Sequence, residues 1–162
     1  MAVHRPWDRP ALWLGFAALA SWGGVALALL SQYRFDMPPC PWCTLQRLIF
    51  LVIGALAVLA LALRPAGARR ALAAVGLLLS LSGVAAALWQ HFVAAASDSC
   101  ALTFADRLMQ GLGLYDLAPS VFVPMASCAD AAVDLLGIPY AFWSLALFVV
   151  VGAACARAVQ RS

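Results

Sequence analysis

Apolar and polar positions follow one another along this chain in long blocks, without the short alternation of a soluble fold. Four strongly apolar blocks with almost no charges predict helices over residues 11–31, 43–63, 71–91 and 139–157. A helix that crosses about 30 Å of hydrocarbon needs roughly 20 residues, which is the length of these blocks. The pattern therefore predicts an all-α membrane protein, a bundle of four transmembrane helices forming a single domain over residues 1–162.

The segments on one side of the predicted membrane differ in length. Residues 32–42 make a short loop in which Pro38 and Pro39 stop the first helix, whereas residues 92–138 make a long one. Long loops in compact proteins are usually functional or disordered. Within the second loop four apolar residues share one helical face, which predicts a short helix lying in the membrane interface: Phe104, Leu108, Met109 and Leu112.

Composition excludes a water-soluble domain. Hydrophobic residues make up 65% of the chain and charged residues 10%, whereas soluble domains have roughly 45–50% and 25%. All ten basic residues other than histidine are arginine, and the acidic residues are all aspartate. The net charge of +3 follows from how these arginines flank the apolar blocks, so we expect a lipid bilayer as the surroundings and no nucleic-acid partner.

The arginines also predict the orientation. One side of the four blocks carries seven arginines against Asp8 alone, namely Arg5, Arg9, Arg64, Arg69, Arg70, Arg157 and Arg161. By the positive-inside rule this side and both termini are cytoplasmic. The first block, preceded by Arg5 and Arg9 and containing Ala26-Leu27-Ala28, also resembles a cleavable signal peptide. Its apolar run continues past that candidate site, which favours a retained helix.

Four of the five cysteines lie on the predicted outer side. Cys40 and Cys43 form a Cys-x-x-Cys before the second block, and Cys100 and Cys128 lie in the long loop. Cys155 lies near the cytoplasmic end of the fourth block, where we interpret it as a reduced packing residue. An even set of cysteines in an oxidising compartment is typical of disulfide chemistry, although four cysteines permit three connectivities.

The Cys-x-x-Cys has the features of a reactive pair. Pro41 suits the first turn of a helix because it has no amide hydrogen to leave unpaired. Both sulfurs would then lie near the positive end of the helix dipole, which stabilises thiolates and makes the disulfide more oxidising. A ring this small adds little stability, since stabilisation by a disulfide grows with loop length. The motif therefore favours redox reactivity.

Two polar side chains are predicted near the motif at the membrane boundary. Arg47 lies four residues after Cys43 and shares its helix face, and His91 ends the third block at a similar depth. Arg47 could stabilise a Cys43 thiolate and donate to a quinone oxygen, and His91 could bind the same ligand or relay a proton. Contact with lipid headgroups is the alternative for both. We interpret four nearby aromatic residues as a membrane-interface belt: Trp42, Trp89, Tyr140 and Trp143.

Other chemistry remains open from the residues alone. Cys100 and Cys128 could complete a zinc site with the motif, but the sequence has no second Cys-x-x-Cys, so we expect no metal. They could equally form an inert structural disulfide. At the level of function, the alternatives are a transmembrane thiol–disulfide electron conduit and a non-enzymatic membrane protein held by disulfides. A conduit needs cysteines within the spans, where Cys155 alone is found.

Taken together, these features resemble the disulfide bond formation protein B family. The resemblance rests on Cys40-Pro41-Trp42-Cys43 and Arg47 opening the second span, His91 closing the third, and Cys100 and Cys128 in a long outer loop. It covers nearly the whole chain and implies a four-span protein of the bacterial inner membrane with its redox site on the periplasmic side. The implied activity is a quinone-dependent thiol oxidase that reoxidises a periplasmic DsbA-like thiol oxidase.

The resemblance also implies roles for individual residues. Cys100 would be attacked by the reduced partner, with Cys128 as its disulfide partner, and Cys40 would exchange with Cys128. Cys43 would pass electrons to ubiquinone or menaquinone through a thiolate–quinone charge-transfer complex. Arg47 and His91 would contact the quinone.

Overall fold

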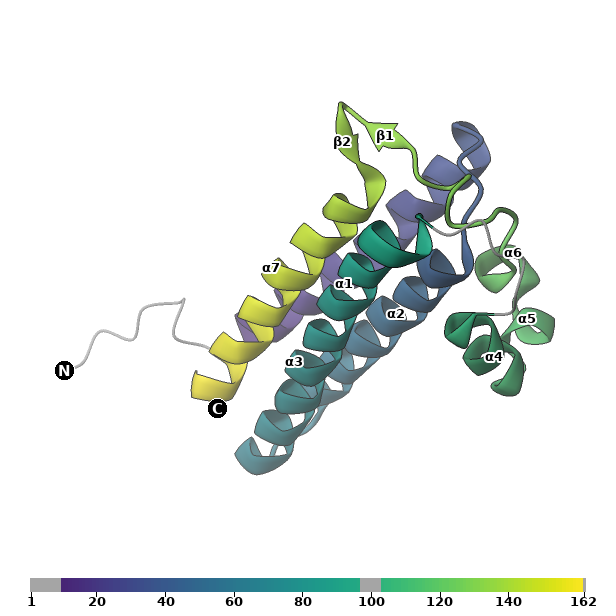
Figure 1. The fold of residues 1–162 in the computed structure, drawn as a ribbon. Coiled ribbons are helices and arrows are strands. Elements are labelled where there is room, and N and C mark those ends of the chain that lie inside the picture. Colours follow the sequence, from purple (N-terminus) through teal and green to yellow (C-terminus); the bar gives the residue numbers. More distant parts are fainter. Residues whose placement is uncertain (1–9, 97–102, 162) are drawn as a thin grey trace.

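Four long helices dominate the computed structural model, which describes residues 10–96 and 103–161 (Figure 1). They are α1 (Pro10–Arg34), α2 (Pro41–Ala62), α3 (Ala66–Trp89) and α7 (Tyr140–Arg161). All four are long and apolar enough to cross a membrane, α3 together with the turn that follows it. The predicted fold class, an all-α bundle of four membrane-spanning helices, is confirmed.

The four helices form a ring in which α1 packs against α2 and α7, and α3 packs against the same two neighbours. At its centre the rings of Phe50 and Phe148 stack with centroids 3.8 Å apart. A side chain at Gly83 would collide with the Phe148 ring, so this glycine allows α3 and α7 to approach closely. Large apolar side chains such as Leu19 and Leu78 face outward, as expected where lipid replaces water as the surrounding solvent.

The long loop between α3 and α7, named the second outer loop after its predicted side of the membrane, folds at the end of the bundle where α2 begins (Figure 1). It contains three short helices, α4 (Phe104–Gly111), α5 (Leu114–Leu117) and α6 (Pro119–Phe122), of which α4 and α6 pack against α2. A two-stranded antiparallel hairpin follows, with β1 (Asp134–Leu135) paired to β2 (Ile138–Pro139), and leads directly into α7. Gly137 in its turn has a φ of 76°, a conformation that favours glycine.

Helix α4 coincides with the short helix predicted in the long loop. Thr103 caps it by accepting from the Asp106 amide, while the Asp106 carboxylate accepts from the Thr103 amide. Met109 on its inner face is fully buried against Leu45 of α2, whereas Phe104 is two-thirds exposed. The helix is therefore amphipathic, and its placement in the membrane interface stays a prediction.

The outer end of α3 continues as a π-helical turn, η2 (Gln90–Ala94). Such turns are rare and occur frequently at functional sites, because the extra residue changes which side chains point inward. Here Gln90 and Ala94 are buried, whereas Phe92 is mostly exposed. The turn therefore directs an amide side chain into the bundle beside the first residues of α2.

Candidate functional site: a sulfur cluster beside a membrane cavity

Helix α2 begins at the Cys-x-x-Cys. Pro41 is its first residue, and Cys40 is the N-cap, whose Sγ accepts from the Cys43 backbone amide at 3.3 Å. The two sulfurs are 2.8 Å apart, in the hydrogen-bonded arrangement of the reduced pair. Cys40 is fully buried and Cys43 partly exposed. The start of α2 thus holds both thiols in position to form a disulfide that closes a very short loop.

Cys128 lies on the other side of Cys40. The two thiols are hydrogen-bonded, and together with Ala94 and Ala131 they form a small buried cluster. Burial, followed by the hydrogen bonds to Cys128 and Cys43, raises the pKa of the Cys40 thiol. The hydrogen bond from Cys40 lowers the pKa of Cys128. Cys40 is therefore the protonated central member of a line of three sulfurs, with Cys128 the readier thiolate at one end.

Three hydrogen bonds attach the segment before Cys128 to α1 and to the loop between α1 and α2. The carbonyl of Pro39 accepts from the amides of Met125, at 2.9 Å, and Ala126. Upstream, the hydroxyl of Tyr33 in α1 donates to the carbonyl of Ser120 at 2.7 Å. These contacts bring the second outer loop onto the first and so place Cys128 against Cys40.

Arg47 points into the protein, and its side chain is only 6% exposed. Its Nη1 donates to Gln32 Oε1 at 2.7 Å and to the Val121 carbonyl at 3.0 Å, while Nη2 donates to the Ala28 carbonyl. These bonds account for three of the five guanidinium N–H groups. Arg47 therefore joins α1, α2 and α6 inside the molecule, and this is not the geometry of a side chain extended to lipid headgroups.

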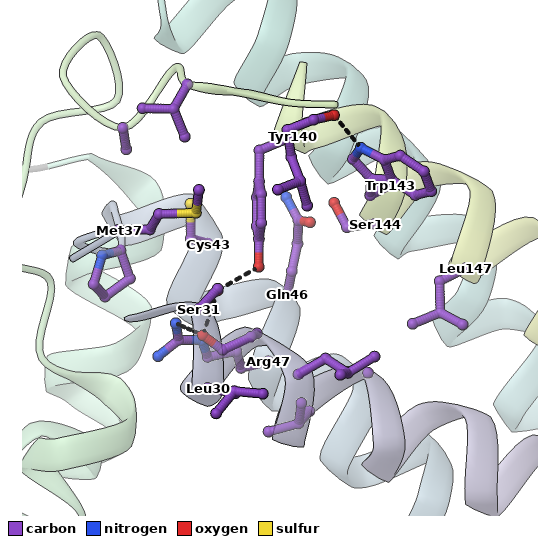
Figure 2. A pocket seen from close by; sticks show the side chains of 18 of the residues that line it. Leu30, Ser31, Met37, Cys43, Gln46, Arg47, Tyr140, Trp143, Ser144 and Leu147 are labelled. Carbon is purple, nitrogen blue, oxygen red and sulfur yellow. Dashed lines mark hydrogen bonds between the residues drawn. The ribbon is translucent and has the colours of Figure 1, made fainter. Parts of the chain in front are cut away.

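Cys43 and Arg47 both face a cavity of about 450 Å³ between α1, α2 and α7 (Figure 2). Its walls are mainly aliphatic and aromatic. Polar groups gather at the end nearest the sulfurs, among them Ser31, Gln46, Gln90, Tyr140 and Ser144. The Tyr140 hydroxyl is hydrogen-bonded to Ser31 at 3.1 Å. An apolar cavity with a few convergent polar groups is the usual form of a small-molecule site.

Two glutamines connect this polar end to the sulfur. Gln46 Nε2 donates to Gln90 Oε1 at 2.6 Å, and Gln90 Nε2 donates to Cys43 Sγ at 3.2 Å. Both side chains are buried. In the part of the chain that the structure describes, no group of three or more His, Cys, Asp or Glu residues is arranged to hold a metal ion. The groups that meet at this end of the cavity are thiols, amides, hydroxyls and one guanidinium.

Comparison with known proteins agrees with this arrangement. A family model described as disulfide bond formation protein DsbB matches residues 9–158. This chain belongs to the DsbB family.

Curated members of the DsbB family align over most of their length. Disulfide bond formation protein B 1 of Pseudomonas syringae pv. syringae is 36% identical over 143 residues, covering 85% of this chain and 80% of the relative. Disulfide bond formation protein B of Aromatoleum aromaticum is 33% identical over 146 residues, covering 87% and 86%. No solved structure gave a significant match. Membership in the DsbB family supports a role as a disulfide oxidoreductase in the membrane.

The predicted site residues are only partly brought together. Cys40, Cys43, Cys128 and Arg47 converge on one region, whereas Cys100 lies outside the described residues. His91 packs against the rings of Phe92 and Phe142 and is not among the residues that line the cavity. Its contact with a quinone stays a prediction.

Sequence reasoning missed the polar residues that surround the cysteines. Gln32, Gln46 and Gln90 were not singled out, although buried amides at the ends of apolar helices are costly and often functional. Tyr140 and Trp143 were interpreted as a membrane-interface belt, yet both line the cavity, and the Trp143 indole donates to the Leu135 carbonyl. Helix-end aromatics look alike in sequence whether they face lipid or the bundle interior.

Proposed function

We propose that this DsbB family member generates disulfides at the periplasmic face of a bacterial inner membrane. It would reoxidise a periplasmic DsbA-like thiol oxidase by thiol–disulfide exchange and pass the electrons to a membrane quinone, ubiquinone or menaquinone. The observation that carries this proposal is the position of Cys40. It touches Cys128 on one side and lies 2.8 Å from Cys43 on the other, and Cys43 borders the cavity.

The exchange steps follow from this order of sulfurs. A thiolate of the reduced partner attacks Cys100 in a Cys100–Cys128 disulfide, forming a mixed disulfide and releasing the Cys128 thiolate. Cys128 then attacks Cys40, which breaks the Cys40–Cys43 disulfide and releases Cys43 as the leaving thiolate. The partner's second thiol displaces Cys100, and Cys100 reforms its bond with Cys128 and frees Cys40. The partner is now a disulfide, and Cys40 and Cys43 carry its two electrons.

The cavity residues fit a quinone ring. Its volume of about 450 Å³ lies within the range of small-molecule sites, roughly 300–1,000 Å³. Arg47 would donate to a carbonyl oxygen, and the Tyr140 and Ser144 hydroxyls would orient the ring beside Cys43. A bound quinone accepts two electrons and two protons, which balances the oxidation of the Cys40 and Cys43 thiols. Because the cavity lies between lipid-facing helices, a lipid-soluble oxidant could reach it directly.

Turnover by the purified protein tests this proposal. The protein in detergent is mixed with quinone and a reduced Cys-x-x-Cys substrate, and quinone absorbance is followed. We expect Cys43→Ser to abolish quinone reduction. We expect Arg47→His to slow it about tenfold or more, the scale expected for losing a hydrogen bond to a charged group. Arg107→His, on the exposed face of α4, is the matched control and should leave turnover unchanged.

The outcomes separate the alternatives. Quinone reduction that survives Cys43→Ser would contradict the proposed route. Absence of turnover with both quinones, in a protein whose outer cysteines are oxidised and stable, would favour the non-enzymatic protein held by disulfides.

A further inference from the structure

We infer that Gln90 is a catalytic residue that donates a hydrogen bond to the Cys43 thiolate, and that Gln46 is the positioning residue that orients it. The inference rests on the proposed function, because it concerns the sulfur that faces the cavity. Neither glutamine belongs to the Cys-x-x-Cys motif. They come from α2 and from the π turn after α3, which only the fold brings together.

An ionised Cys43 can only accept a hydrogen bond, and this sets the direction of the two hydrogen bonds. A glutamine amide has one carbonyl oxygen that accepts and one NH₂ group that donates. Gln46 Nε2 lies 2.6 Å from Gln90 Oε1, so the carbonyl of Gln90 is occupied by Gln46. The NH₂ group of Gln90 is thereby turned toward Cys43 Sγ, 3.2 Å away. Gln46 thus determines which end of the Gln90 amide the sulfur meets.

A donor is needed at this place because of the surroundings. Cys43 lies in the first turn of a membrane-spanning helix, where its released thiolate has little access to water. An anion in such surroundings is costly unless donors face it, and a hydrogen bond from a neutral amide stabilises it without adding charge. Gln90 complements Arg47, which donates its hydrogen bonds to oxygens of α1 and of the second outer loop.

The glutamines could instead serve only to join α2 and α3, as polar pairs do in membrane bundles. The two roles differ in what they change. A purely structural pair affects stability and leaves the reactivity of Cys43 unchanged. A donor to the sulfur changes how readily Cys43 exists as thiolate, whether or not quinone is present.

The test measures alkylation of Cys43 in quinone-free protein. Cys43 is left as the sole cysteine by Cys40→Ser, Cys100→Ser, Cys128→Ser and Cys155→Ala; serine at position 40 can still cap α2. We expect Gln90→Met to slow iodoacetamide alkylation near pH 7 about tenfold, the size expected for losing a hydrogen bond to a charged group. The rates should converge at a pH where every thiol is ionised. Gln110→Met, at an exposed glutamine of α4, is the matched control.

The variant Gln46→Met tests whether Gln46 acts on Cys43 through Gln90. Gln46→Met should slow alkylation less than Gln90→Met, because the amide of Gln90 remains but loses its orientation. In a Gln90→Met background Gln46→Met should have no further effect, since Gln46 acts through Gln90. Unchanged rates in both single variants would overturn the inference, and so would additive effects. If Gln90→Met does not fold, comparing the alkylation rate of Gln46→Met with that of the Gln110→Met control still tests the inference.

Failure of this inference is distinguishable from failure of the proposed function. Parent protein that reduces quinone, with glutamine variants that alkylate at the parental rate, would remove the role of Gln90 and leave the function standing. Slower alkylation in the variants, with no quinone reduction by the parent, would support the donor role and contradict the quinone oxidoreductase.

Discussion

At the scale of single residues, the arrangement depends on Cys40 being the central sulfur. It touches both Cys43 and Cys128, and its burial keeps it protonated. In the reduced protein its hydrogen bond lowers the pKa of Cys128. A nucleophile in thiolate form next to a buried disulfide sulfur is what exchange requires. The geometry therefore places Cys128 where it can exchange with Cys40.

The lowered pKa predicts the pH dependence of Cys128 alkylation. Thiols react as thiolates, and an ordinary thiol has a pKa of roughly 8.5. In reduced protein carrying Cys43→Ser, Cys100→Ser and Cys155→Ala, the alkylation rate of Cys128 should reach half its maximum at a lower pH than that of an unperturbed thiol. Adding Cys40→Ala removes the donor and should move the midpoint upward. Peptide mapping by mass spectrometry separates Cys128 from Cys40, and an unchanged midpoint would contradict the assignment.

At the scale of elements, short segments of the second outer loop are attached to the ends of the long helices. The Tyr33 hydroxyl donates to the Ser120 carbonyl, and Arg47 donates to the Val121 carbonyl. The Pro39 carbonyl accepts from the amides of Met125 and Ala126. Each bond is modest, but together they fix residues 120–126 over the start of α2. The loop can thus bring Cys128 to Cys40 although 88 residues separate them in sequence.

Weakening this attachment should slow the meeting of the two sulfurs. Tyr33→Phe removes the hydrogen bond to Ser120, worth about 0.5–1.5 kcal/mol, so formation of a Cys40–Cys128 disulfide should slow about two- to tenfold. The rate is measured under mild oxidation in protein with Cys43→Ser, Cys100→Ser and Cys155→Ala. Tyr115→Phe removes a hydroxyl from the same loop, where it bonds Asp106, and is the control. Equal rates in the two variants would show that Tyr33 does not hold the segment.

At the scale of the whole molecule, the two ends of the bundle carry different structural features. The sulfur cluster, the loop helices and the polar end of the cavity lie at one end, and the α2–α3 connection lies at the other (Figure 1). The distribution of arginines predicts that the first end is periplasmic. The proposed disulfide exchange with a periplasmic partner requires that orientation, because the cytoplasm keeps thiols reduced.

Labelling from one side of the membrane checks this orientation. In a cysteine-free background, Gln110→Cys on α4 and Gly67→Cys in the first turn of α3 place thiols at opposite ends, and both positions are exposed. A maleimide that cannot cross membranes should label position 110 in intact spheroplasts and position 67 only after lysis. The reverse pattern would overturn the predicted topology.

The sequence by itself determined the four-helix membrane fold and located the Cys-x-x-Cys at the start of the second helix. Long apolar blocks permit hardly any other structure in lipid, since only helices satisfy their backbone hydrogen bonds locally. The short helix after Thr103 was also predictable, because helical spacing is a local signal. The Cys-x-x-Cys was visible for the same reason, as its two thiols are neighbours in the chain.

Only the tertiary structure decided which distant side chains meet. Gln32, Gln46 and Gln90 gather around Cys43 and Arg47 because α1, α2 and the π turn converge, and no local spacing encodes that. It also decided that Tyr140 lines the cavity and that His91 packs on phenylalanines. The apolar pattern separates membrane from water. Which face of a helix points inward depends on the packing of all four helices together.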